Sequence, residues 1–156
     1  MSVTRTTLYS PMNDIRRNSR IDGIPEPTGP FHWTAEWNGL AFISGVRGID
    51  PLTGLPASDD ARRLELIFDY LRRILASVGS SLEHVLSSTV YVTDMSVRPM
   101  VNNAYVKAFG SHLPTRTIVQ VAALNQNDSI EIAVIAAKAA VAYDDRPKRS
   151  GQRNNQ

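Results

Sequence analysis

The chain has 156 residues, 42% of them apolar and 21% charged, which suits one globular domain and is too short for two comfortable ones. It contains no cysteine, which excludes disulfides, thiolate catalysis and cysteine-ligated zinc and fits a reducing compartment. The net charge is only +2, no apolar run reaches the ~18 residues of a membrane span, and residues 1–24 lack the apolar core of a secretory signal. We therefore expect a cytoplasmic protein that binds neither nucleic acid nor a membrane.

The two ends of the chain differ in composition from the middle. Residues 1–28 are repeatedly interrupted by proline and glycine, which predicts an extended N-terminal arm. Residues 144–156 are polar and basic, which predicts a disordered tail. The remaining residues, 29–143, are expected to form the single domain.

The domain begins with a predicted β-hairpin. Apolar and polar residues alternate over 32–37, and a second strand-like run covers 40–46. Between them stands Asn38-Gly39, a pair that favours a tight turn between two antiparallel strands.

Two helices are predicted further along the chain. Apolar residues recur at helical spacing from about 58 to 78, with Ser58 or Asp59 available to cap the first turn. A second, shorter helix is predicted over 99–110, because proline suits its first turn and glycine its end.

Three more strands complete the predicted elements. Alternation over 85–95 predicts a strand between the two helices, and two further runs, 116–124 and 129–137, follow the second helix. The resulting order is ββαβαββ. Such an order predicts an α+β fold in which a sheet is covered by two helices on one face.

Several kinds of catalytic site have little support in the sequence. His32, His84 and His112 are far apart and share no metal-ligand spacing. The glycines of residues 45–54 match no phosphate-binding pattern, and Ser44 lies in no Gly-x-Ser-x-Gly motif. We therefore expect no metal, no catalytic thiol and no covalent nucleophile.

Two charged residues open the last two strand-like runs, which are otherwise mostly apolar: Arg116 and Glu131. One interpretation is an ordinary ion pair, or two charges that face water. If the two runs formed a hairpin, Ala122 would oppose Glu131, and Arg116 would lie six residues, about 20 Å, along the strand. A direct hairpin therefore excludes a salt bridge. The two side chains then meet through another pairing or across a subunit boundary, or they act separately.

An arginine and a carboxylate in one cleft suit a specific reaction. A guanidinium binds a carboxylate through two parallel hydrogen bonds, and a carboxylate can orient and deprotonate a water molecule. Together they suit hydrolysis of a small imino acid, in which water adds to the carbon of a C=N bond and ammonia leaves. Because such a substrate is already electrophilic, positioning alone can supply ~7–11 kcal/mol of the barrier.

Six short motifs occur in order: GPF at 29–31, ISG at 43–45, DPLTG at 50–54, VNNAY at 101–105, PTRT at 114–117 and IEIAVIA at 130–136. In this order and spacing the chain, from about residue 29 to 140, resembles the RidA/YjgF family of enamine/imine deaminases. The resemblance implies a chorismate-mutase-like fold with a mixed sheet and a homotrimer with active sites between subunits. It also implies a cofactor-free enzyme that hydrolyses enamine or imine acids to oxo acids and ammonia.

The resemblance further implies roles for individual residues. Arg116 matches the arginine that binds the substrate carboxylate, and Glu131 matches the acidic residue associated with the catalytic water. Gly45 lies where backbone groups of the family line the pocket, and Asn102 matches an asparagine near the site.

Two positions depart from the family pattern. Phe31 stands where many members have tyrosine, and Ile118 stands where cysteine is frequent. Both residues make the predicted pocket more apolar, which favours longer imino acids over 2-aminoacrylate.

Other functions remain open. PTRT also resembles 2-aminomuconate deaminases of aromatic degradation, which would make the chain a pathway-specific deaminase. The alternative from a different class is a non-catalytic trimer that binds small carboxylates or a protein partner. Retention of both Arg116 and Glu131 favours catalysis, since binding alone needs only the arginine. Ribonuclease activity, attributed to relatives, has less support because the body of the chain has no basic stripe with interleaved aromatic residues.

Overall fold

A computed structural model describes residues 14–139, so residues 1–13 of the predicted arm and the predicted tail 144–156 lie outside the described residues. The strands are β1 (Arg16–Asn18), β2 (Thr34–Trp37), β3 (Leu40–Arg47), β4 (Val85–Val92), β5 (Thr115–Gln120) and β6 (Ile130–Ala137). The helices are α1 (Asp60–Ser77) and α2 (Arg98–Phe109), with short 3-10 turns η2 (Leu82–His84), η3 (Met95–Val97) and η4 (Asn125–Asn127). Apart from β1, this is the predicted ββαβαββ order.

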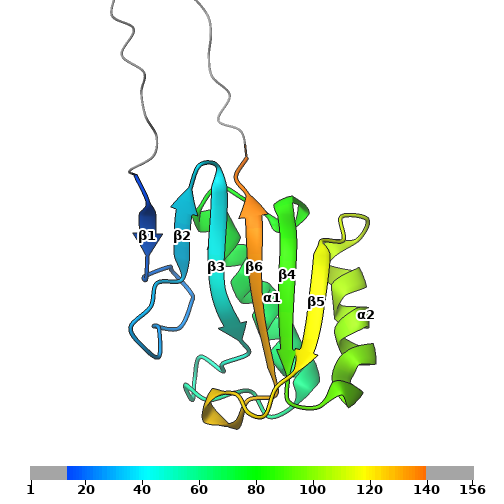
Figure 1. Ribbon diagram of the computed structural model, residues 1–156. Helices are drawn as coiled ribbons and strands as arrows, with labels where there is room; N and C mark the ends of the chain where they lie inside the picture. Colours follow the sequence, from blue (N-terminus) through cyan, green and yellow to red (C-terminus); the bar gives the residue numbers. More distant parts are fainter. Residues whose placement is uncertain (1–13, 140–156) are drawn as a thin grey trace, which may run out of the picture.

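The six strands form one mixed sheet in the order β1-β2-β3-β6-β4-β5. Only β4 and β5 run parallel, and β6 lies between β3 and β4, antiparallel to both. The last two strands therefore do not form a hairpin with each other. Figure 1 shows α1 behind the sheet and α2 beside α1, at the β5 edge.

The predicted hairpin is confirmed as β2–β3. Trp37 pairs with Leu40 across the turn, and both turn residues have positive φ, 49° at Asn38 and 76° at Gly39. Two successive left-handed residues give the turn a twist that matches that of the flanking strands, and asparagine and glycine adopt them at low cost.

Both helices begin and end close to the predicted residues. The Asp59 carboxylate accepts a hydrogen bond of 2.8 Å from the backbone N–H of Arg62 and so caps α1. Pro99 lies in the first turn of α2. The apolar stripe of α1 is buried against the sheet, where Ile67 and Leu71 join Ile132 of β6 in the core at 0% exposure.

Two sequence predictions need correction. The strand predicted over 85–95 ends at Val92, because the Asp94 side chain accepts from the Ser96 N–H and starts the turn η3. The arm predicted over 1–28 is not separate from the domain in its described part. There β1 extends the sheet, and Ile21 and Ile24 pack against the core.

In the described part of the chain, no helix covers the second face of the sheet. It carries the outward residues of the alternating strands, among them Phe42 of β3, which is 40% exposed, and Val119 of β5, which is 37% exposed. Within residues 14–139, no helix is long and apolar enough to cross a membrane.

Candidate active site in two parts

Arg116 lies on the edge strand β5 beside α2. Its Nη2 donates to Asn102 Oδ1 at 2.8 Å, and its guanidinium carbon lies 4.7 Å from the centroid of the Tyr105 ring. Asn102 and Tyr105 are three residues apart in α2, a spacing that places both on one helix face. The Tyr105 hydroxyl is itself held at 2.5 Å by the buried Ser88 of β4, so the ring is a fixed support.

These residues line the Arg116 hollow, a shallow surface cavity of about 290 Å³ formed by Asn102, Tyr105, Val106, Leu113, Pro114 and Arg116. Stacking on Tyr105 and the bond to Asn102 fix the plane of the guanidinium. A planar guanidinium held in this way presents its remaining N–H groups as a fork that matches a carboxylate.

Glu131 lies near the start of β6, and its side chain is 28% exposed. It belongs to the Glu131 hollow, a cavity of about 320 Å³ formed by Thr28, Phe31, Ser44, Gly45, Arg47, Asn125 and Glu131. The carboxylate lies directly over Gly45, where an added Cβ would come within 1.9 Å of Glu131 Oε1. Only glycine therefore leaves room for the carboxylate in this position.

A break in the β3–β6 ladder creates this space. Ile43 pairs with Val134 and Val46 with Ile132, so the register shifts by one residue around Ser44 and Gly45. The Ser44 hydroxyl donates to the His32 carbonyl at 2.7 Å, which ties the bulge to the segment that carries Phe31. β-Bulges often turn side chains near active sites.

Burial raises the pKa of Glu131 above that of an ordinary glutamate. The nearby Arg47 guanidinium lowers this pKa, and the Asp128 carboxylate raises it, but burial is the largest cause. A carboxylate with a raised pKa is a stronger base when it is ionised, as a residue that deprotonates water requires.

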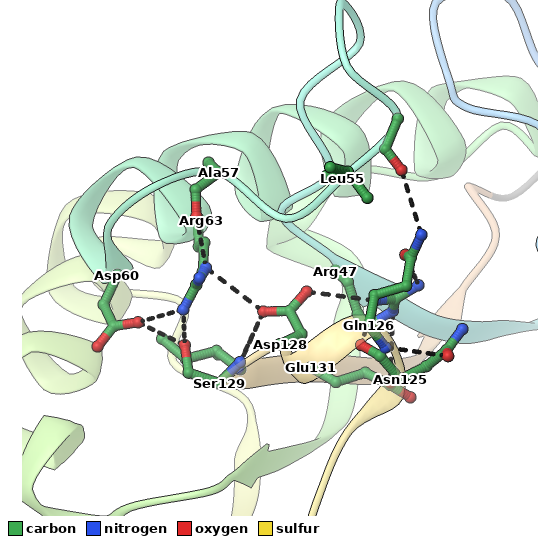
Figure 2. A network of polar contacts seen from close by, with 12 residues as sticks. Arg47, Leu55, Ala57, Asp60, Arg63, Asn125, Gln126, Asp128, Ser129 and Glu131 are labelled. Carbon is green, nitrogen blue, oxygen red and sulfur yellow. Dashed lines mark hydrogen bonds and ion pairs between the residues drawn. The ribbon is translucent and has the colours of Figure 1, made fainter.

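Arg47 was not identified from the sequence, where it falls just beyond the predicted strand 40–46. Its side chain is only 8% exposed, and its Nε lies 4.0 Å from Glu131 Oε2. Figure 2 shows Arg47 between the loop of residues 125–128 and Glu131, with Arg63 and Asp60 of α1 on the far side of Asp128. An arginine immediately after a run of apolar strand residues was the signal that could have identified it.

Within one chain the two hollows are separate. Arg116 pairs with Ser88 on β4, and Glu131 pairs with Tyr91 on the same strand. Because these two positions on β4 are three residues apart, their side chains point to opposite faces of the sheet. Arg116 faces the helices, and Glu131 faces the uncovered side.

Five of the six site residues predicted from the sequence line one or the other of these two hollows. Arg116 and Asn102 come together in one hollow, and Glu131, Gly45 and Phe31 come together in the other. Ile118 lines neither hollow and packs against the core opposite Val90, so its place in a pocket wall stays a prediction. Among residues 14–139, no three His, Asp or Glu side chains are grouped so as to hold a metal ion.

Comparison with known proteins identifies the family. The family model described as Endoribonuclease L-PSP matches residues 23–138. A RutC family protein of Pyrococcus horikoshii is 33% identical over 118 residues, which cover 75% of this chain and 94% of the relative. Reactive Intermediate Deaminase A, chloroplastic, of Arabidopsis thaliana is 34% identical over 113 residues, 72% of this chain and 60% of the relative.

The solved structures agree with the sequence relatives. The crystal structure of RidA from an Antarctic Psychrobacter bacterium superposes with a TM-score of 0.74 at 29% identity, covering 78% of this chain and 99% of that one. The mixed sheet with two helices on one face is therefore the chorismate-mutase-like α+β fold. The chain belongs to the RidA/YjgF family.

Proposed function

We propose that the protein is a deaminase that hydrolyses enamine or imine acids to oxo acids and ammonia. The observation that carries the proposal is the placement of Glu131, a half-buried carboxylate held over Gly45 in a hollow lined partly by Phe31. Relatives that are named reactive intermediate deaminases support the same reaction class.

In the proposed reaction Arg116 binds the substrate carboxylate and Glu131 acts on water. Glu131 removes a proton from water as the oxygen bonds to the imine carbon, and the C=N electron pair moves onto nitrogen. Glu131 passes this proton to nitrogen, then takes the second oxygen-bound proton and delivers it to the nitrogen as the C=O bond forms, so the C–N bond breaks and ammonia leaves. Imine and water thus give oxo acid and ammonia, with no cofactor or redox step.

The two hollows can serve one substrate only if different subunits supply them. We propose a homotrimer in which the uncovered sheet faces pack inward and the Arg116 hollow of one subunit adjoins the Glu131 hollow of the next. The exposed apolar side chains Phe42 and Val119 on this face support such packing, because the contact would remove them from water.

Phe31 suggests which substrates fit. It is 36% exposed and packs edge-on against Trp33 with ring centroids 5.4 Å apart, so an apolar ring borders the Glu131 hollow. Longer or more apolar imino acids should therefore react faster than 2-aminoacrylate. 2-Aminomuconate, an unsaturated acid with a longer chain, is one candidate within that group.

Ammonia release from imino acids generated in situ tests the proposal. The panel contains 2-aminoacrylate, bulkier aliphatic and aromatic imino acids, and 2-aminomuconate, each with Glu131→Gln protein as the control. The expected result is accelerated ammonia release that is fastest with a bulky substrate and lost in the control. Release at the uncatalysed rate from every substrate would leave the non-catalytic binding protein as the better interpretation, and a marked preference for 2-aminoacrylate would refute the argument from Phe31.

A further inference from the structure

Arg47 is a buried arginine whose hydrogen bonds go to one loop. Its Nη1 donates to the Asn125 carbonyl at 2.9 Å and lies 3.4 Å from Asp128 Oδ2. Its Nη2 donates to Gln126 Oε1 at 3.1 Å. Both terminal nitrogens are thus engaged within the protein, so Arg47 is poorly placed to act as a second fork for a substrate carboxylate.

The loop that Arg47 holds is strained and borders the Glu131 hollow. Gln126 and Asn127 both have φ of 56°, two successive non-glycine residues in the left-handed region. Asn125, just before them, lines the hollow. Strained backbone of this kind persists where surrounding contacts fix it, and it concentrates at functional sites. The Arg47 bonds to Asn125 and Gln126 are such contacts.

Among the residues that the structure describes, Arg47 also supplies the positive charge nearest to Glu131. The separation of 4.0 Å is too long for a hydrogen bond but close enough for a strong charge interaction in a half-buried site. Within residues 14–139, further titratable groups around Glu131 include Asp128 in the loop and Tyr91, its pair on β4. Arg63 of α1 lies behind Asp128 at 3.6 Å and balances part of that carboxylate's charge.

We propose that Arg47 is a positioning residue for Glu131, holding the strained loop 125–128 at the rim of the hollow and setting its positive charge 4.0 Å from the carboxylate that lies over Gly45. The catalytic part of this inference rests on the proposed deaminase function. The effect on ionisation does not, because it can be measured in the protein without substrate. Loss of the Arg47 charge leaves burial and Asp128 unopposed, so the pKa of Glu131 should rise further.

The test follows the Glu131 carboxyl group by ¹³C NMR. The chain has only five glutamates, at positions 26, 36, 65, 83 and 131, so protein labelled at the glutamate carboxyl carbon gives five signals. Glu131→Gln assigns the signal of interest by removing it. In Arg47→Met we expect the titration midpoint of Glu131 to move to higher pH. Arg72→Met, the same change at an exposed arginine of α1, should leave it in place.

Kinetics with the fastest substrate of the panel provide the second measurement. In Arg47→Met the acid limb of the kcat profile should move to higher pH with the NMR midpoint. Arg47→Lys keeps a charge but not the set of loop bonds, so its midpoint should stay near that of the wild type while kcat falls about ten- to a hundredfold from misplacement of the base. KM should change far less than kcat in both variants.

Each outcome decides the proposal. A folded Arg47→Met protein with an unchanged Glu131 midpoint would overturn it, whether or not any substrate is turned over. If Arg47→Met does not fold, Arg47→Lys decides, because wild-type kcat in that variant would show that the loop bonds do not position the base. If no substrate releases ammonia, the proposed function fails, while the NMR midpoint still tests the pairing of Arg47 with Glu131.

Discussion

Arg116 is held from two directions, by the Asn102 side chain at 2.8 Å and by the Tyr105 ring beneath its guanidinium. This support contributes to function only if the planar shape of the guanidinium is needed to bind the substrate carboxylate. Arg116→Lys keeps the charge but removes the fork, so kcat/KM should fall thirtyfold to several thousandfold, or ~2–5 kcal/mol. Steady-state ammonia release measures the loss. Arg72→Lys on α1 is the matched control, and an Arg116→Lys protein with full activity would contradict the carboxylate clamp.

The Glu131→Gln variant tests whether Glu131 is the base that deprotonates water. The amide keeps the shape and hydrogen bonding of the side chain but cannot accept a proton from water, so kcat should fall more than KM rises.

The raised pKa of Glu131 also predicts an effect of pH on folding stability. Because the folded protein holds the Glu131 proton more tightly than the unfolded chain, ionisation costs stability as pH rises through the raised pKa.

The stability of Glu131→Gln relative to the wild type should therefore increase from acidic to neutral pH. Denaturant midpoints at several pH values, at fixed protein concentration, measure the difference. A relative stability that stays constant with pH would mean that burial does not raise the Glu131 pKa.

The buried carboxylate of Asp128, just before β6, connects this strand to α1 and β3 through two arginines. Its side chain is 0% exposed and lies 3.4 Å from Arg47 Nη1 and 3.6 Å from Arg63 Nε. Figure 2 shows it between the two guanidinium groups. Asp128→Asn leaves two buried cations without their shared counter-charge, which should cost about 3 kcal/mol of folding stability.

Urea denaturation at fixed protein concentration measures this loss as a lower midpoint with an unchanged slope. Asp69→Asn is the matched control, because Asp69 pairs with Arg73 at 3.0 Å on the exposed face of α1. Exposed pairs contribute little, so the control should change stability by less than about 0.5 kcal/mol. Equal losses in the two variants would show that the Asp128 network does not join these elements.

Local sequence patterns were enough to predict most helices and strands, but they did not predict how the strands pair in the sheet. The hairpin followed from Asn38-Gly39 and the first helix from its apolar spacing and Asp59, because those signals act within a few residues. The strand β1 was missed because Arg16–Asn18 is fully polar and shows no alternation. The insertion of β6 between β3 and β4 depends on contacts across distant segments, which short motifs do not encode.

The candidate site, too, could be predicted from the sequence only in part. The residue types at positions 116 and 131 indicated the chemistry, and the family resemblance supplied their roles. Their placement on opposite faces could not be predicted, because it depends on the register of β4 with both β5 and β6. Arg47 was missed since its partners at 125–128 are about eighty residues away in sequence.

For the whole molecule, the uncovered sheet face predicts self-association. Phe42, Val119 and the half-buried Ile135 leave this face too apolar for a lone subunit, whereas inward packing in a trimer would cover it. Light scattering at micromolar concentration should give three times the 17.2 kDa chain mass. A mass of one chain would exclude the proposed arrangement, and Phe42→Glu should weaken assembly where Leu52→Glu, at an exposed loop residue, should not.

In the proposed trimer one active site takes Arg116 from one subunit and Glu131 from the next, and mixing of variant subunits tests this arrangement. Arg116→Ala and Glu131→Gln proteins, each inactive alone, are unfolded together, refolded as mixed trimers and assayed for ammonia release. With random mixing about a quarter of the sites regain both native residues if the two come from different subunits. We therefore expect about a quarter of wild-type activity to recover in the mixture and none in either variant refolded alone. No recovery in verified mixed trimers would place both residues of each site in one subunit and refute a site shared between subunits.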